Sequence, residues 1–82
     1  MKWLLYVLQC SDNTYYTGVT TDIKRRVHEH NTSKRGAKYT KTRRPVKIVY
    51  LSEYESRSSA QKSEYRFKQL TRKQKEEVIN KA

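Results

Sequence analysis

Six consecutive apolar residues, Trp3 to Leu8, constrain the fold of this 82-residue chain more than any other feature. A run that is apolar at every position is typical of a strand that is covered on both faces. The turn-forming sequence SDNT follows Cys10 directly, which disfavours a helix over the same residues. We therefore predict that residues 3–10 form the central strand of a small sheet.

A second strand and a helix are predicted next. The sequence YYTGV (15–19) is a short strand that pairs with the first as a β-hairpin, with its turn near Asp12 and Asn13. The sequence TTDIKRRVHEHN (20–31) then has the character of a helix that begins after an N-cap at Thr21 or Asp22.

The predicted helix over 20–31 carries two polar residues on its apolar side. On a helical wheel, Ile23 and Val27 define the apolar stripe, and Arg26 and His30 lie on it or beside it. The other charged residues of this helix fall on the opposite side. We therefore expect Arg26 and His30 to point inward.

The second half of the chain predicts a third strand over residues 46–54 and helices over 56–70 and 71–80. Ser58 with Gln61, and Thr71 with Gln74, have the spacing of capping boxes at the two helix starts. The element order is β-β-α-β-α-α. It indicates a single domain over residues 1–82 of the α+β class, with helices packed on a three-stranded sheet.

Glu64 is an anomaly in the predicted helix over 56–70. It shares the apolar stripe of that helix with Ala60 and Phe67. A carboxylate in such a position either forms a structural ion pair or has a chemical role.

The net charge indicates a polyanionic partner. Lys and Arg number 19 and Asp and Glu number 8, which gives a net charge of +11. Such a charge repels itself, and nucleic acid is the partner that most often accounts for it, although a basic solvated surface is the alternative. The connection over 32–45 has no regular period, and we interpret it as a nucleic-acid-binding arm and not merely a solvated coil. Its cations are Lys34, Arg35, Lys38, Lys41, Arg43 and Arg44.

Other classes of protein are disfavoured. The single cysteine, Cys10, has no partner for an internal disulfide, and no zinc-ligand spacing is present. The apolar run is too short to span a membrane and lacks a signal-peptide pattern. We expect a cytosolic protein that is a monomer and does not bind membranes.

The inward-facing polar residues suit phosphodiester cleavage. An arginine fork matches phosphate oxygens, a histidine orients groups or exchanges protons, and a carboxylate holds a divalent metal such as Mg²⁺. Tyr6 and Tyr16 lie on neighbouring strands and can share one face, and Gly18 marks a close approach to the second strand. Each residue also has a purely structural interpretation: packing tyrosines, a bend at the glycine and an arginine that reaches past the core.

The motifs LLY (4–6) and YTG (16–18), followed by an arginine, a histidine and a distant glutamate, resemble a GIY-YIG endonuclease domain, most closely the small standalone bacterial group. The resemblance extends over nearly the whole chain and implies a three-stranded antiparallel sheet flanked by helices. It also implies metal-dependent DNA hydrolysis with one Mg²⁺ or Mn²⁺ ion. The residues that match the family's catalytic positions are Tyr6, Tyr16, Arg26, His30 and the metal-binding Glu64, with Gly18 as a motif residue.

Two departures qualify the resemblance. The first motif lacks its glycine, and Val19 stands where repair nucleases of the family carry a lysine. Of the two tyrosines we prefer Tyr16 as the general base. Larger family members have separate DNA-binding domains, so here we expect specificity to come from the basic arm, from DNA shape or from a protein partner.

Three functions follow from this reasoning. The first is an endonuclease that acts on DNA, with branched, damaged or single-stranded DNA as candidate substrates in repair or recombination. The second is a module on the same scaffold that binds nucleic acid without cutting it. The third is an RNA-binding protein associated with translation.

Overall fold

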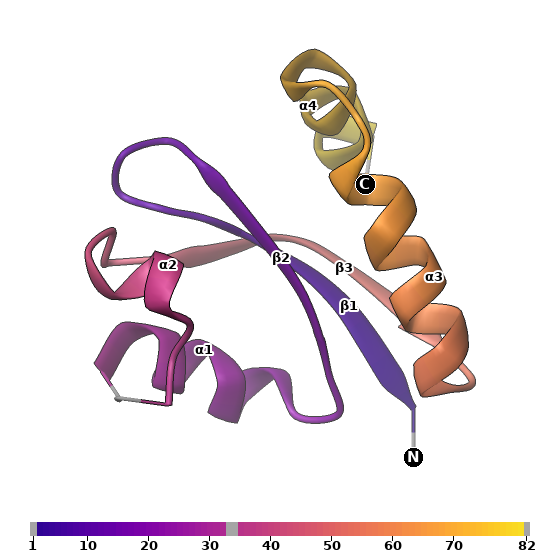
Figure 1. Ribbon diagram of the computed structural model, residues 1–82, viewed down its shortest axis with the longest axis horizontal. Coiled ribbons are helices and arrows are strands. Elements are labelled where there is room, and N and C mark those ends of the chain that lie inside the picture. The colour runs from indigo at the N-terminus through magenta and orange to yellow at the C-terminus, as the bar shows by residue number, and fades with distance from the viewer. Residues whose placement is uncertain (1, 33–34, 82) are drawn as a thin grey trace.

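The computed structural model describes residues 2–32 and 35–81 and shows the predicted α+β fold (Figure 1). The elements are β1 (Trp3–Gln9), β2 (Tyr15–Thr20), α1 (Ile23–Thr32), α2 (Lys38–Lys41), β3 (Lys47–Tyr54), α3 (Arg57–Lys68) and α4 (Arg72–Lys81). The predicted order is confirmed. The connection that we expected to be irregular differs in one respect, because it contains the four-residue helix α2.

The sheet has the strand order β2-β1-β3, and both pairings are antiparallel. Strand β1 is therefore central, and the four residues from Leu5 to Leu8 are all buried. This confirms the prediction from the apolar run. Successive side chains of a strand point to opposite faces of the sheet, so four consecutive buried residues mean that both faces of β1 are covered.

The helices cover opposite faces of the sheet (Figure 1). Ile23 and Val27 of α1 pack against the cluster that contains Tyr6 and Leu8. On the other face, Phe67 of α3 stacks on Tyr50 of β3, with ring centroids 6.3 Å apart. Helices α1 and α3 therefore lie on either side of β1 and β2.

The helix starts are set by local hydrogen bonds, and one predicted capping residue is wrong. Asp22 accepts from Arg25 N at 3.1 Å at the start of α1. Thr71 and Gln74 form the predicted reciprocal box at the start of α4. For α3 the cap is Ser56, which accepts from Ser59 N, and not the predicted Ser58, which lies within the helix.

Helix α4 is the most peripheral element and extends from the end of α3 (Figure 1). None of its residues is fully buried, and Val78 and Ile79, which we expected to dock it, are half-buried. In the part of the chain that the structure describes, no helix is long and apolar enough to cross a membrane.

Candidate active site

The two tyrosines of the hairpin lie on one face of the sheet, as their positions predict. Tyr6 pairs with Gly18 and Leu8 pairs with Tyr16 across β1 and β2, so these side chains share a face. The rings of Tyr6 and Tyr16 are 6.4 Å apart. A Cβ atom on Gly18 would lie 2.5 Å from the Tyr6 hydroxyl oxygen. Glycine is required here because the tyrosine ring lies directly across the backbone of β2.

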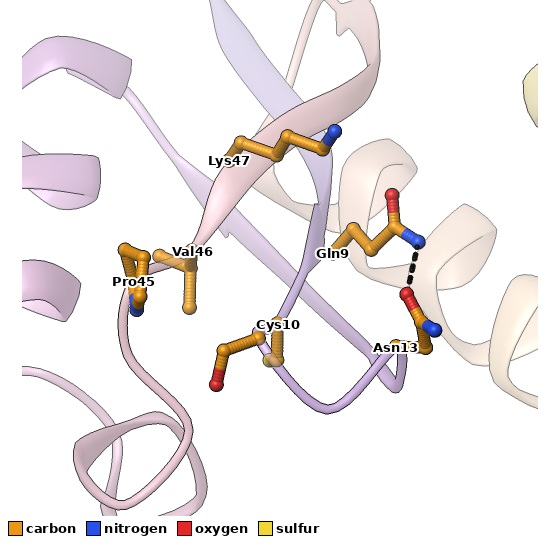
Figure 2. A pocket seen from close by; sticks show the side chains of 7 residues that line it. Gln9, Cys10, Asn13, Pro45, Val46 and Lys47 are labelled. Atoms are coloured by element: carbon orange, nitrogen blue, oxygen red, sulfur yellow. Dashed lines mark hydrogen bonds between the residues drawn. The ribbon is translucent and has the colours of Figure 1, made fainter.

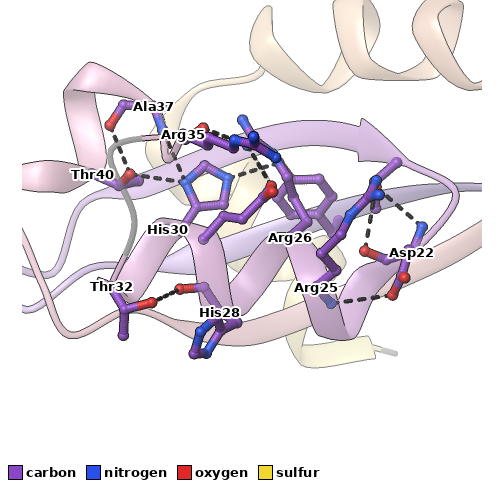
Figure 3. A network of polar contacts seen from close by, with 12 residues as sticks. Asp22, Arg25, Arg26, His28, His30, Thr32, Arg35, Ala37 and Thr40 are labelled. Atoms are coloured by element: carbon purple, nitrogen blue, oxygen red, sulfur yellow. Dashed lines mark hydrogen bonds and ion pairs between the residues drawn. The ribbon is translucent and has the colours of Figure 1, made fainter.

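Helix α1 brings His30 and Arg26 to the same place. His30 is fully buried, and its Nε2 lies 2.9 Å from the Tyr6 hydroxyl. Its ring is 4.9 Å from that of Tyr16. Arg26 is half-buried and donates from Nη1 to Glu29 Oε1 at 3.1 Å and to the carbonyl oxygen of Arg35 at 2.8 Å (Figure 3). The helical wheel had placed both residues inward, and the structure does so.

Burial keeps both partners of the Tyr6–His30 hydrogen bond neutral. Burial, together with the nearby charge of Arg26, lowers the pKa of His30 to about 4. Burial raises the pKa of Tyr6 to about 12, although Arg26 opposes that increase through a hydrogen bond and its charge. For Arg26, burial lowers the pKa, but hydrogen bonds with Tyr6 and Glu29 outweigh it, so the net pKa is raised and Arg26 remains a cation.

Glu64 lies on α3, on the opposite face of the sheet from α1. Its side chain is 21% exposed and pairs with Lys68 Nζ at 3.1 Å. It makes no direct bond to the tyrosines, Arg26 or His30 among residues 2–32 and 35–81. Its negative charge is the weakest of the influences on the pKa of Tyr6, which it raises. We place the candidate active site around the Tyr6 hydroxyl, which the structure brings together with His30 and Tyr16 but not into contact with Glu64.

The acidic residues suit one kind of metal ion. In the described ranges, no three His, Cys, Asp or Glu side chains gather as a metal cluster. A single partly exposed carboxylate fits Mg²⁺, which is often held by one or two carboxylates, substrate phosphates and several waters. It does not fit a structural zinc site, which needs four protein ligands.

Two residues of the site could not have been found from the sequence. Thr40 Oγ1 lies 2.8 Å from His30 Nδ1, and Thr40 is fully buried. The Tyr39 ring stacks on Tyr16 at 6.1 Å, with the Arg43 guanidinium 3.9 Å from its centre. Both come from the connection without a regular period. The one available signal was Gly36, where a Cβ atom would lie 2.6 Å from the Glu29 carbonyl oxygen.

The cations of the predicted binding arm have different surroundings. Lys38 and Lys41 are exposed on α2, and Arg35 is also exposed. Arg43 pairs with Asp12 at 3.0 Å. Arg44 donates to the carbonyl oxygen of His30 at 2.6 Å, so it holds the end of α1. Lys34 lies outside the described residues.

A pocket of about 300 Å³ lies away from these residues, at the hairpin end of the sheet (Figure 2). Gln9, Cys10 and Asn13 line one side, and Pro45 and Val46 the other. The amide of Gln9 donates to Asn13 Oδ1 at 3.1 Å. None of the catalytic residues expected from the sequence lines this pocket, so it is not the candidate active site.

Comparison with known proteins identifies the family. A family model described as the GIY-YIG catalytic domain matches residues 2–77. The chain belongs to the GIY-YIG family. It is 49% identical over 77 residues to the UPF0213 protein DP2720 of Desulfotalea psychrophila, covering 94% of this chain and 70% of that protein. It is 58% identical over 74 residues to the UPF0213 protein lmo0166 of Listeria monocytogenes, covering 90% of this chain and 81% of that protein.

Solved structures extend the agreement to the fold of this GIY-YIG chain. The solution NMR structure of the protein EF2693 from E. faecalis has a TM-score of 0.68 and 43% identity, over 99% of this chain and 85% of that one. That of the UPF0213 protein BH0048 from Bacillus halodurans has a TM-score of 0.63 and 40% identity, over 98% and 84%. The resemblance seen in the two tyrosine motifs is therefore confirmed.

Proposed function

We propose that this GIY-YIG protein is a metal-dependent endonuclease that hydrolyses phosphodiester bonds of DNA. The observation that carries the proposal is the buried Tyr6 hydroxyl, which lies 2.9 Å from His30 Nε2 and whose pKa is influenced by Arg26 and, most weakly, by Glu64. A module that only binds DNA does not need this arrangement. The net charge of +11 supports a polyanionic substrate.

Arg26 is the phosphate-binding residue in this proposal. Its guanidinium is a planar fork that matches two phosphate oxygens. The raised pKa keeps it charged beside the buried tyrosine. A fixed positive charge in a partly buried site stabilises the negative charge that develops on the phosphate during attack.

Tyr16 is the general base in this proposal. Its side chain is half-buried, and its hydroxyl makes no hydrogen bond to the residues that the structure describes. It is therefore open to the attacking water. The Tyr6 hydroxyl is already hydrogen-bonded to His30 and has a pKa of about 12, so it remains a neutral phenol.

Glu64 would hold Mg²⁺ or Mn²⁺ through its carboxylate. A bound divalent ion neutralises charge on the phosphate and lowers the pKa of nearby oxygen acids. Lys68 now pairs with this carboxylate at 3.1 Å and is half exposed, so its ammonium can move into solvent when a cation binds. Branched, damaged or single-stranded DNA in the cytosol is the proposed substrate, which implies a role in repair or recombination.

A cleavage assay tests the proposal. Supercoiled and branched DNA are incubated with the wild-type protein, Glu64→Gln and a matched control, Glu76→Gln, in Mg²⁺ or Mn²⁺. Glu76 pairs with Arg72 on α4 and is half exposed, so its loss removes one carboxylate far from Tyr6. We expect the wild type and Glu76→Gln to cut, and Glu64→Gln to bind DNA without cutting it.

The competing function is a non-cleaving DNA-binding module. The high positive charge favours it as much as it favours an enzyme. It would be established if the wild type bound DNA and left it intact with either metal. A salt titration tests the binding arm in both cases: if it contacts four phosphates, log K falls with log[salt] with a slope of about −3.6. A flat response would exclude the arm.

A further inference from the structure

The hydrogen bonds around His30 determine which ring nitrogen carries its proton. Nδ1 lies 2.8 Å from Thr40 Oγ1 and 3.4 Å from the backbone nitrogen of Ala37 (Figure 3). Nε2 lies 2.9 Å from the Tyr6 hydroxyl. A neutral imidazole has one donor nitrogen and one acceptor nitrogen, so its neighbours select the tautomer.

The Thr40 hydroxyl has one hydrogen and two acceptors within reach. These are His30 Nδ1 and the carbonyl oxygen of Ala37, which is 2.9 Å away. That carbonyl oxygen already accepts the backbone N–H groups of Thr40, at 3.0 Å, and Lys41, at 3.2 Å. The hydroxyl hydrogen can point to either acceptor, so the direction is set by whether His30 Nδ1 carries a hydrogen.

The backbone N–H of Ala37 decides between these two directions. In residues 2–32 and 35–81 its hydrogen-bond acceptor is His30 Nδ1. A hydrogen on Nδ1 would face this N–H and leave it without a partner, and unpaired backbone donors away from water are costly. Nδ1 therefore carries no hydrogen and acts as an acceptor, so the Thr40 hydroxyl, 2.8 Å from it, donates to it.

We propose that Thr40 is a positioning residue that holds neutral His30 with its proton on Nε2, so that His30 donates a hydrogen bond to Tyr6. His30 then orients the tyrosine and does not take a proton from it. The complete burial of the imidazole and its pKa of about 4 agree with a neutral ring.

The consequence for catalysis rests on the proposed function, whereas the tautomer does not. The Tyr6 oxygen accepts a hydrogen bond from His30, which leaves the hydrogen of its own hydroxyl to point elsewhere. The donors then run in one direction, from Thr40 through His30 to Tyr6. Such a chain polarises its last hydroxyl, which can stabilise negative charge on a phosphate or on the Tyr16 phenolate.

Imidazole NMR tests the tautomer directly, in ¹⁵N-labelled protein at pH 7 without DNA or metal. We expect His30 to show an unprotonated Nδ1 and a protonated Nε2 in long-range ¹H–¹⁵N spectra. His28 is the internal control, because its exposed ring has no hydrogen-bond partner among the described residues and should show averaged nitrogens. A protonated Nδ1 on His30, or averaged nitrogens, would overturn the proposal.

Two substitutions assign the effect to the Thr40 hydroxyl. Thr40→Val keeps the branched shape and removes the donor, and Thr40→Ser keeps the donor. We expect the two His30 nitrogens to move toward averaging in Thr40→Val and to resemble the wild type in Thr40→Ser, with both folds checked by their amide spectra. An unchanged His30 spectrum in folded Thr40→Val would remove Thr40 from this role. If Thr40→Val does not fold, the wild-type spectrum still decides the tautomer.

Cleavage kinetics test the consequence. Losing one hydrogen bond of about 1.4 kcal/mol corresponds to an about tenfold lower rate. We expect this loss in kcat and not in KM for Thr40→Val, with recovery in Thr40→Ser. Equal kcat in Thr40→Val and wild type would contradict the consequence. A wild type that does not cut at all would overturn the proposed function, and the NMR result would still decide the tautomer.

Discussion

Tyr15 and Tyr16 are adjacent in β2, yet their side chains lie on opposite faces of the sheet and have different surroundings. Tyr15 lies under the guanidinium of Arg72, which is 4.3 Å from the ring centre. Tyr16 packs on the buried His30 and influences the pKa of Arg26. Each face thus brings an arginine to a tyrosine, but only the Tyr16 face surrounds the pair with a buried polar network.

The ion pairs of the two arginines show the same contrast. The Arg26–Glu29 and Arg72–Glu76 pairs both have N–O distances of 3.1 Å within one helix. The side chains of the first pair are 25% and 15% exposed, and those of the second are 50% and 49% exposed. Water screens the second pair much more than the first. Equal chemistry at equal distance therefore yields a site on one face and an ordinary surface on the other.

Replacing each arginine by alanine should give the largest difference between the two faces, measured as the cleavage rate. We expect Arg26→Ala to lower the cleavage rate by about 10²–10³-fold, the usual effect of removing one preorganised donor from a developing charge. Arg72→Ala should change it less than about twofold, because Arg72 contacts Tyr15 and Asn13 and not the site. Both rates are measured under single-turnover conditions. Equal losses in the two variants would place the active site elsewhere.

The two histidines should differ in how they couple stability to pH. The pKa of His30 falls from its ordinary value of 6.5 to about 4 on folding. Between these values the unfolded chain binds a proton that the folded chain does not, so the free energy of unfolding falls as the pH falls. The difference corresponds to about 3 kcal/mol at most, present above pH 6.5 and lost progressively toward pH 4.

Urea unfolding at a series of pH values measures this effect. Carboxylates also titrate near the lower end, so the wild type is compared with His30→Gln and with His28→Gln. We expect the pH dependence between 6.5 and 4 to be weaker in His30→Gln and unchanged in the variant of the exposed His28. The same slope in all three proteins would show that the burial of His30 is not coupled to pH.

The periodic parts of the chain were predictable. The alternation of the strands placed Tyr6 and Tyr16 on one face, and the helical wheel turned Arg26 and His30 toward them. The directions of these side chains follow from the regular periods of strands and helices, which hold along the whole of each element. The position of Glu64 on its helix was predictable as well, but not its pairing with Lys68, because ion-pair partners depend on side-chain rotamers.

The non-periodic parts were not predictable. Thr40 lies in a four-residue helix, which is too short to produce a pattern, and it meets His30 only because Gly36 lets the chain pack against the end of α1. The N-cap of α3 was predicted two residues late, at Ser58 and not Ser56, because the sequence ESRSSA offers several serines as caps. Which serine is used depends on where β3 ends, and this is a tertiary constraint.

A methyl group on Gly18 should perturb only the Tyr16 face. Its Cβ atom would lie 2.5 Å from the Tyr6 hydroxyl oxygen and 2.7 Å from Cζ, so the buried ring must move. We expect Gly18→Ala to lower the free energy of unfolding by about 1–3 kcal/mol, as overpacking usually does. In NMR spectra, His30 should shift and the exposed His28 should not. An unchanged unfolding midpoint would mean that the ring moves freely, which would contradict a fixed Tyr6–His30 bond.

The smallest difference is expected from the two helix glutamates. Glu76→Gln should change the free energy of unfolding by no more than about 0.5 kcal/mol, because exposed ion pairs contribute little. Glu29→Gln should cost about 1 kcal/mol, because Arg26 then loses the half-buried carboxylate of its ion pair and is left with an uncharged acceptor. Raising the salt concentration should diminish the first effect more than the second, since screening acts mainly on exposed charges. Equal costs and equal salt dependence would mean that water reaches Arg26 as freely as Arg72, and the contrast between the two faces would then lie in shape alone.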